Sequence, residues 1–418
     1  MELHVLDAIM GSGKTTRLIE LIAKLPSSEK IIYITPLLSE CHRIAGTTPD
    51  EEDYDKPLLL DGENYLYDEN HPLANRCFML PCTKKGINGT KSRDFMELVR
   101  YGCNIVSTHS LFNSLTPSIH LMIKQQGYTL VLDESISVYE IYEELSDIKE
   151  LKAFINNGII SLLDDNITLS WNHDKIEYKG IKRLTEIGNL CDNRRLLLID
   201  GKVVMLEFPI DIITSFKKIY LASYMFKYTP MYAYLCSHNV NITFHKFGKK
   251  PSEYKNLINL IEDSKLNEIG NDYYSLSEKF YRNKTLNFIM TRNLNNFFRY
   301  NIKTKANDRI WTIFKKYKTC IGGKQYNKQW VACSTKATNQ YQHIENVAYL
   351  INLFPNPMLL KLLYSKGIHL DIEKYALVEM LQFIWRSRIR NEQSINLYIP
   401  SSRMRSLFHQ WLNDEFND

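Results

Sequence analysis

The sequence lacks several features that define other classes of protein. None of its apolar runs approaches the roughly 18 residues that a membrane-spanning helix requires. Lys and Arg number 52 against 47 Asp and Glu, and this small formal net charge of +5 permits a nucleic-acid partner without requiring one. Hydrophobic residues make up 44% and charged residues 24%, which excludes collagen-like and disordered classes. The 418 residues are enough for two or three domains.

Disulfide and secretion signals are missing as well. The eight cysteines are scattered and mostly lie inside apolar stretches, a pattern typical of free buried thiols. The first residues, MELHVLDAIMGSGKTT, contain neither a basic leader nor a small-residue cleavage site, so we do not expect secretion. We therefore expect a cytoplasmic protein.

Short apolar runs alternate with helical periodicity along the first part of the chain. This alternation predicts an α/β fold with a mostly parallel sheet that helices cover on both faces. The expected strands are 3–9, 30–36, 104–107 and 128–135, and the expected helices are 17–25, 38–44, 94–101 and 110–125.

Residues 140–215 interrupt this order and are interpreted as an insertion. A helix is expected over 139–156, followed by two small hairpins, the second of which turns at Gly201. The pattern then restarts, with a strand expected over 284–293 and helices over 344–364 and 373–390. We therefore expect one domain over 1–238 and a second over 239–418.

Residues 8–16, AIMGSGKTT, stand between a predicted strand and a predicted helix and match a P-loop with Ala8 in place of the first glycine. The two glycines of the turn let backbone N–H groups point into one concavity, and the helix N-terminus adds positive potential. Lys14 is expected to reach the β- and γ-phosphates of ATP, and Thr15 to ligate Mg²⁺. The alternative is a glycine turn with an incidental lysine. The predicted nucleotide-binding residues are Gly11, Ser12, Gly13, Lys14, Thr15 and Thr16.

Two acids, Asp133 and Glu134, end the apolar strand LVLDE. Next to a P-loop, Asp133 is expected to hold Mg²⁺ and Glu134 to polarise the attacking water. The alternative is that both carboxylates simply cap a following helix.

The segment QFIWRSRIR carries the third predicted group. On one continuous helix, Gln382, Arg386 and Arg390 lie four residues apart and share a face. Closely spaced arginines among apolar neighbours favour contact with an anion, and an arginine finger on a phosphate explains them; a solvated charged stripe is the alternative. The finger is either Arg388 or Arg390, and we favour Arg390.

The order of these motifs resembles a superfamily 2 helicase of the compact DEAD/DEAH-like type found in phages and bacteria. The resemblance runs from residue 3 to about 405 and departs from the family's pattern at Trp385, where a glycine is usual. It implies two RecA-like domains in tandem that sandwich ATP, and catalytic roles for Lys14, Asp133, Glu134, Gln382, Arg386 and Arg390. It also implies nucleic-acid contacts from Thr35, Thr108, His109, Arg292 and Lys336, and coupling of hydrolysis to movement through Ser223, Thr338 and Asn339.

The implied function is an ATP-dependent helicase or translocase with ATP and Mg²⁺ as cofactors. Its partner would be nucleic acid, with single-stranded or forked DNA favoured over RNA, and other replication or recombination proteins are further candidates. Two alternatives stay open: a packaging-type ATPase joined to a nuclease, and a remodelling protein that uses ATP only as a clamp on nucleic acid. The resemblance also implies the cytoplasm of a bacterium or of a phage-infected host.

Overall fold

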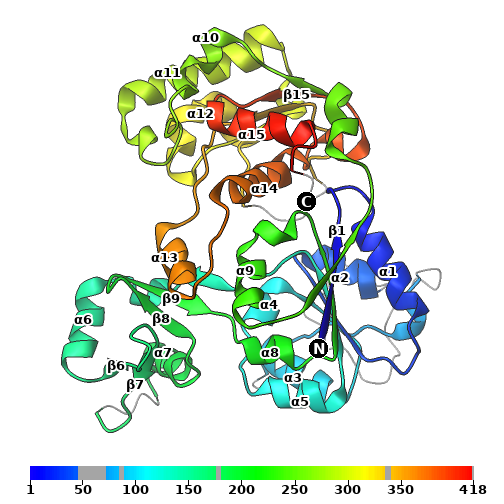
Figure 1. Cartoon of the computed structure of the whole chain (residues 1–418), viewed down its shortest axis with the longest axis vertical. Coiled ribbons are helices and arrows are strands. Elements are labelled where there is room, and N and C mark those ends of the chain that lie inside the picture. Colours follow the sequence, from blue (N-terminus) through cyan, green and yellow to red (C-terminus); the bar gives the residue numbers. More distant parts are fainter. Residues whose placement is uncertain (46–71, 84–88, 176–179, 335–339, 417–418) are drawn as a thin grey trace. The chain divides into compact units, whose positions relative to one another are not determined.

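The computed structural model describes residues 1–45, 72–83, 89–175, 180–334 and 340–416 (Figure 1). The chain divides into two compact units. The first consists of Met1–Leu6, Thr15–His245 and Asn356–Leu370, and the second of Asp7–Lys14, Lys246–Pro355 and Asp371–Asp418. Among the described helices, none has both the length and the apolar character needed to cross a membrane.

A six-stranded sheet forms the centre of the first unit. Three of its strand pairs, β10–β4, β4–β2 and β2–β3, are parallel, as the alternation of strands and helices predicts. Every residue of β2 and β4 is buried, which explains why these strands are continuous apolar runs rather than alternating ones. In sheet order the strands are β11 (Ile242–Lys246), β1 (Glu2–Asp7), β10 (Lys218–Ser223), β4 (Thr129–Asp133), β2 (Ile31–Thr35) and β3 (Ile105–Thr108).

Helices join these strands, and α5 packs against both α3 and α8. The helix expected over 110–125 is divided in two, because the turn that contains Pro117 lies between α4 and α5. The helices around this sheet are α1 (Lys14–Lys24), α2 (Leu38–Ala45), α3 (Lys91–Arg100), α4 (His109–Asn113), α5 (Ile119–Gln126), α8 (Ile210–Thr214) and α9 (Pro230–Ser237).

The expected insertion forms a small antiparallel layer with its own apolar core. The hairpin at Gly201 is confirmed, with φ of +63° at the glycine. The helix expected over 139–156 is wrong in its first part, where a strand and a short turn precede α6. Figure 1 shows α6 and α7 beside the strands. The elements are β5 (Tyr139–Ile141), α6 (Ile148–Asn156), β6 (Ile160–Leu162), β7 (Leu169–Trp171), α7 (Lys182–Asp192), β8 (Leu196–Ile199) and β9 (Val203–Glu207).

One helix of the first unit comes from late in the sequence. In α13 (Pro357–Ser365), Leu362 and Leu363 belong to the apolar core of this unit. The ammonium group of Lys361 lies 2.7 Å from Asp200, in the turn between β8 and β9. The chain therefore returns to the first unit between two stretches that belong to the second.

The second unit contains a four-stranded sheet in which every strand pair is parallel. Its core is rich in aromatic side chains, including Phe297, Phe298, Trp311 and Tyr398. The strands, in sheet order, are β12 (Ile258–Leu260), β15 (Ile395–Tyr398), β14 (Asn346–Tyr349) and β13 (Arg309–Thr312). The α-helices are α10 (Ser264–Asn267), α11 (Lys284–Asn296), α12 (Lys318–Tyr326), α14 (Ile372–Ile384) and α15 (Ser402–Leu412).

Two sequence-based expectations are wrong in this unit. Residues 284–293 form the helix α11 and not a strand: Asn283 caps the helix through its side chain, and Met290 and Leu294 are buried one turn apart. The helix expected over 344–364 contains the strand β14 before α13.

Candidate functional site

The P-loop segment forms a tight turn between β1 and α1. Gly11 and Gly13 have φ of +84° and +78°, in the left-handed region that glycine adopts without steric cost. The Ser12 N–H donates to the Ile9 carbonyl at 3.2 Å, which closes the turn. Lys14 directs its ammonium group back over the loop and donates to the carbonyls of Ala8, at 2.6 Å, and Ile9, at 3.1 Å. A positive charge therefore lies directly over the turn.

Asp133 lies beside the first turn of α1. The Thr15 hydroxyl is 3.0 Å from each of the two Asp133 carboxylate oxygens, although 118 residues separate the two in sequence. Asp133 is only 8% exposed, because β4 lies between β10 and β2 in the sheet. A hydroxyl next to a carboxylate offers the hard oxygen ligands that Mg²⁺ takes in proteins. The two residues that the sequence predicts to hold a metal are thus brought together.

Tyr33 is a further member of this site that sequence reasoning missed. Its hydroxyl donates to Asp133 at 3.4 Å from the neighbouring strand β2, and its ring is fully buried. Burial, and then the nearby Asp133 carboxylate, raise the pKa of Tyr33, so the phenol stays a hydrogen-bond donor. The only sequence signal was a tyrosine inside an apolar strand that ends on the same edge as β4.

Glu134 has an unusual backbone conformation. Its φ of +81° is rare for a residue with a side chain, and its N–H donates to the Ala222 carbonyl at 3.1 Å. Ala222 also lies opposite Asp133 in the pairing of β10 with β4. Strained conformations of this kind cluster at functional sites, where the surrounding structure holds them in place. Glu134 is half-buried and directly follows the predicted metal-binding aspartate in sequence.

The expectation that Gln382, Arg386 and Arg390 share one helix is wrong. Helix α14 ends at Ile384, and a 3₁₀ turn (Arg388–Asn391) follows, so Arg390 does not lie one helical turn beyond Arg386. Gln382 is half-buried in the last turn of α14. Because the chain changes direction after α14, the three arginines lie in different surroundings and do not share one helix face.

The three arginines of this segment differ in what they bind. Buried Arg386 donates to the carbonyls of Ala332, at 3.0 Å, and Cys333, at 2.8 Å. Arg388 pairs with Glu345 at 2.8 Å. Arg390 forms no ion pair with any residue in the described ranges.

Arg390 also lies against the P-loop turn within the second unit. A Cβ atom added at Gly11 would be 2.7 Å from the Arg390 carbonyl oxygen and 2.9 Å from its Cγ. Only glycine fits at this close approach. Of the two arginines that the sequence leaves as candidates for the finger, Arg390 is the one at this position, and its guanidinium group has no acidic partner among the residues that the structure describes.

The predicted nucleic-acid and coupling residues have varied surroundings. Thr35, His109 and Ser223 are buried, at 0%, 7% and 6% exposure. Thr108 caps α4, and its hydroxyl accepts from the Leu111 N–H at 3.3 Å. Thr16 is exposed in the first turn of α1. Lys336, Thr338 and Asn339 lie outside the described residues.

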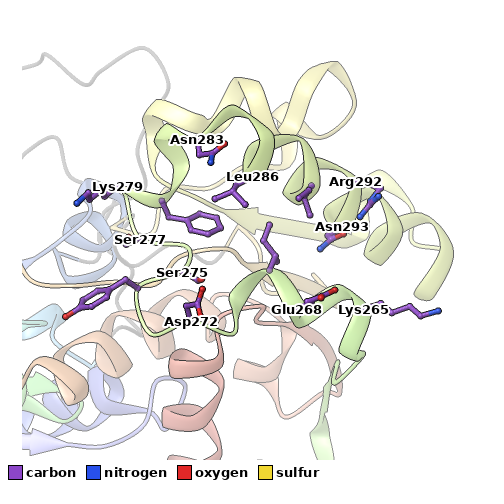
Figure 2. Close-up of a pocket in the computed structure, with 14 residues that line it drawn as sticks. Lys265, Glu268, Asp272, Ser275, Ser277, Lys279, Asn283, Leu286, Arg292 and Asn293 are labelled. Carbon is purple, nitrogen blue, oxygen red and sulfur yellow. The ribbon is translucent and has the colours of Figure 1, made fainter.

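Arg292 is exposed on α11 and lines a pocket in the second unit. Figure 2 shows Arg292 and Asn293 on the α11 side of this pocket, and Glu268 and Lys265 on the opposite side. The pocket has a volume of about 1080 Å³ and is lined only by residues between Lys265 and Asn293. It is therefore built within one stretch of the second unit.

Parallel sheets flanked by helices define this chain as a mixed α/β protein, consistent with Rossmann- or RecA-like domains in tandem. Residues 252–412 match the family model described as the YonV C-terminal Rossmann-like domain. The chain is also 31% identical to the SPbeta prophage-derived uncharacterized protein YonV of Bacillus subtilis (strain 168), with 98% of each chain covered. It therefore belongs to the YonV family. Among solved structures, that of S. tokodaii Xpd4 is similar, with a TM-score of 0.49 and 11% identity over 98% of this chain and 94% of that one.

Proposed function

We propose that the protein hydrolyses ATP, with Mg²⁺, and uses the hydrolysis to move along or unwind nucleic acid. The observation that carries this proposal is the position of Thr15 and Asp133, whose side-chain oxygens lie 3.0 Å apart directly after a glycine turn. A turn rich in N–H groups, a lysine and a hydroxyl–carboxylate pair are the parts that bind a triphosphate and its metal ion. The hydroxyl–carboxylate pair supports the proposal within the first unit, where Asp133 is the last residue of β4 in the parallel part of the sheet.

The residues of the turn have distinct roles in this proposal. The N–H groups around Gly11 and Gly13 bind phosphate oxygens, and Lys14 exchanges the carbonyls of Ala8 and Ile9 for the β- and γ-phosphates. Thr15 and Asp133 hold Mg²⁺, which supplies charge neutralisation on the phosphates when bound.

The acid and arginine groups complete the proposed chemistry. Glu134 accepts a hydrogen bond from the attacking water and orients it toward the γ-phosphate. Arg390 is the proposed finger, because its guanidinium group has no acidic partner in the described ranges. Arg386 acts instead as a positioning residue, since its hydrogen bonds to the carbonyls of Ala332 and Cys333 hold the end of α14 against that segment.

The use of hydrolysis for movement on nucleic acid rests on the order of motifs, which resembles superfamily 2 helicases. The relative YonV is prophage-derived, which fits a protein of phage origin. A protein that uses ATP only as a clamp would bind ATP and nucleic acid without turnover, and a nuclease would cut DNA with Mn²⁺. Assays of ATP hydrolysis, nucleic-acid binding and DNA cleavage therefore distinguish the motor, the clamp and the nuclease.

The test is phosphate release by the full chain, alone and with single-stranded DNA, duplex DNA or RNA. Lys14→Ala is expected to lower turnover by about 100-fold or more, because it removes a charge that stabilises the transferred phosphoryl group. Lys24→Ala, an exposed lysine in the last turn of the same helix, is the matched control and should hydrolyse ATP as the wild type does. Wild-type turnover by Lys14→Ala would overturn the P-loop assignment. Turnover that no nucleic acid stimulates would count against a motor.

A further inference from the structure

Positive charge is concentrated in one part of the second unit. The 42 residues from Ser264, where α10 begins, to Lys305 contain eight Lys and Arg against three Asp and Glu, a formal net charge of +5. The whole chain has the same net charge of +5. Every residue of this stretch lies within the described ranges. The excess of positive charge is thus a local property of this segment and not a feature of the whole chain.

Exposed aromatic side chains accompany this charge. Phe288 is 71% exposed, although phenylalanine is among the residues most often buried in proteins, and Tyr274 is 69% exposed. On α11, Phe288 lies one helical turn after Lys284 and one turn before Arg292, and both cations are exposed. An aromatic ring is therefore presented to solvent between two positive charges.

The pocket of Figure 2 adjoins the row of exposed α11 residues formed by Lys284, Phe288 and Arg292, because Arg292 also lines the pocket. Leu286 and Ile289 of α11 give it apolar lining, Tyr274 contributes its exposed ring, and Lys265 adds a cation on the side opposite α11. Neither Lys265 nor Arg292 forms an ion pair within the described part of the chain.

We propose that the α11 face, which we define as Lys284, Phe288, Arg292, Lys265 and Tyr274, is a binding site for single-stranded nucleic acid. This inference rests on the proposed function and names the site at which its partner is held in the second unit. Phosphates contact Lys284, Arg292 and Lys265, while unpaired bases stack on Phe288 and Tyr274. A cationic surface with exposed aromatic rings fits a single strand, since only unpaired bases offer their ring faces.

Charge and the exposed aromatic rings together favour a single-stranded nucleic acid over an acidic peptide as the ligand of this face. A polyanion matches the net positive charge of this segment, but Glu268 and Asp272 also line the pocket and repel phosphate. The phosphates therefore follow the cations along α11, and a base rather than a phosphate occupies the pocket beside the two acids. An acidic peptide would satisfy the same cations but has no bases to stack on the exposed rings.

The test measures binding of fluorescein-labelled oligo(dT) and oligo(U) to the full chain by anisotropy, without nucleotide and at several salt concentrations. Phe288→Ala should weaken binding by about 5- to 150-fold, the effect of losing one stacked base, and leave the salt dependence unchanged. Phe288→Trp should retain binding. Arg292→Gln should reduce the slope of log affinity against log salt by about 0.7, the loss of one phosphate contact. Because these side chains are exposed, the variants should fold as the wild type does, which circular dichroism checks.

Two substitutions in the first unit are matched controls. Tyr101→Ala removes an aromatic side chain that is 66% exposed, and Lys124→Gln removes an exposed cation. Both should bind the oligonucleotides as the wild type does. Wild-type affinity of Phe288→Ala would overturn the inference. Equal binding of a labelled poly-glutamate peptide that does not depend on Phe288 would also overturn it, because the face would then be a site for acidic protein.

The outcome is independent of hydrolysis. Lys14→Ala, tested in the same assay, should bind oligonucleotide through the α11 face even when it hydrolyses no ATP. If the wild type binds oligonucleotide through the α11 face but hydrolyses no ATP, the proposed motor is rejected and the proposed binding site is kept. Turnover with no effect of Phe288→Ala or Arg292→Gln would reject the site and keep the ATPase.

Discussion

Arg403 offers a direct test of what holds the second unit together. Its side chain is 4% exposed, and its Nε lies 2.8 Å from a Glu373 carboxylate oxygen. One terminal nitrogen donates to the Asn352 side-chain oxygen at 2.7 Å and to the Leu353 carbonyl at 2.9 Å, and the guanidinium carbon lies 4.3 Å from the centre of the Phe354 ring. These partners lie just before and just after the segment Asn356–Leu370, which belongs to the first unit.

Arg403→Met keeps much of the volume of the side chain but removes its charge and donors. Asn352 is fully buried and Leu353 is half-buried, so the Asn352 side-chain oxygen and the Leu353 carbonyl lose a donor that water replaces only in part, at about 1–3 kcal/mol each. Glu373 is 39% exposed, so water restores most of its solvation. We expect the free energy of unfolding of the second unit to fall by about 3–5 kcal/mol, from the two acceptors that lose their donor and from the lost contact with the Phe354 ring.

Tryptophan fluorescence during urea unfolding measures this change locally. Four of the five tryptophans, Trp311, Trp330, Trp385 and Trp411, lie in the second unit. With a slope of about 3 kcal/mol per molar urea, the midpoint should fall by about 1 M or more. Arg282→Met removes an exposed arginine from the same unit and should shift the midpoint little. If Arg403→Met shifts the midpoint no more than Arg282→Met does, the bonds of Arg403 do not stabilise this unit.

Two further changes test the packing and the pH dependence of the fold. In Gly270→Ala, the new Cβ would lie 1.9 Å from the Pro400 carbonyl oxygen, so backbone must move; the second unit should lose about 3 kcal/mol or more, measured by the same urea titration. Burial lowers the pKa of His238, so the unfolded chain binds more protons than the folded chain just below pH 6.5. Stability should therefore fall as the pH falls below about 6.5, and thermal midpoints of His238→Gln between pH 5 and 8 should fall less steeply; identical profiles would contradict this assignment.

The sequence predicts the first unit better than the second for a physical reason. Strands such as β2 and β4 are buried on both faces, so each is an uninterrupted apolar run with clear ends. The P-loop is local as well, because its turn depends on glycines that are neighbours in sequence. The approach of Thr15 to Asp133 followed from strand order, since both residues lie at the ends of elements that meet at one edge of the sheet.

The elements of the second unit are harder to predict, because their sequence patterns are short and mix strand-favouring with helix-favouring residues. Residues 284–293, KTLNFIMTRN, contain aromatic and β-branched residues that favour a strand, but the Asn283 cap and burial of one face select a helix. The exposure of Phe288 contributed to the error, because an apolar residue on the solvent side obscures helical periodicity. The end of α14 at Ile384 was not evident from the sequence, because the apolar residues Trp385 and Ile389 follow it.

The error at α11 and the proposed nucleic-acid site therefore have one origin. A polar residue at position 288 would have left the helical periodicity of α11 clear, whereas Phe288, which the proposed site uses, obscures it. Composition obscured the site in the same way, because a net charge of +5 over 418 residues only permits a polyanionic partner. Outside residues 264–305 the chain carries 44 basic and 44 acidic residues, so the whole excess surrounds this one helix. At about 0.15 M salt a charge acts over roughly 8 Å, and its distribution therefore decides where a polyanion binds, while the total does not.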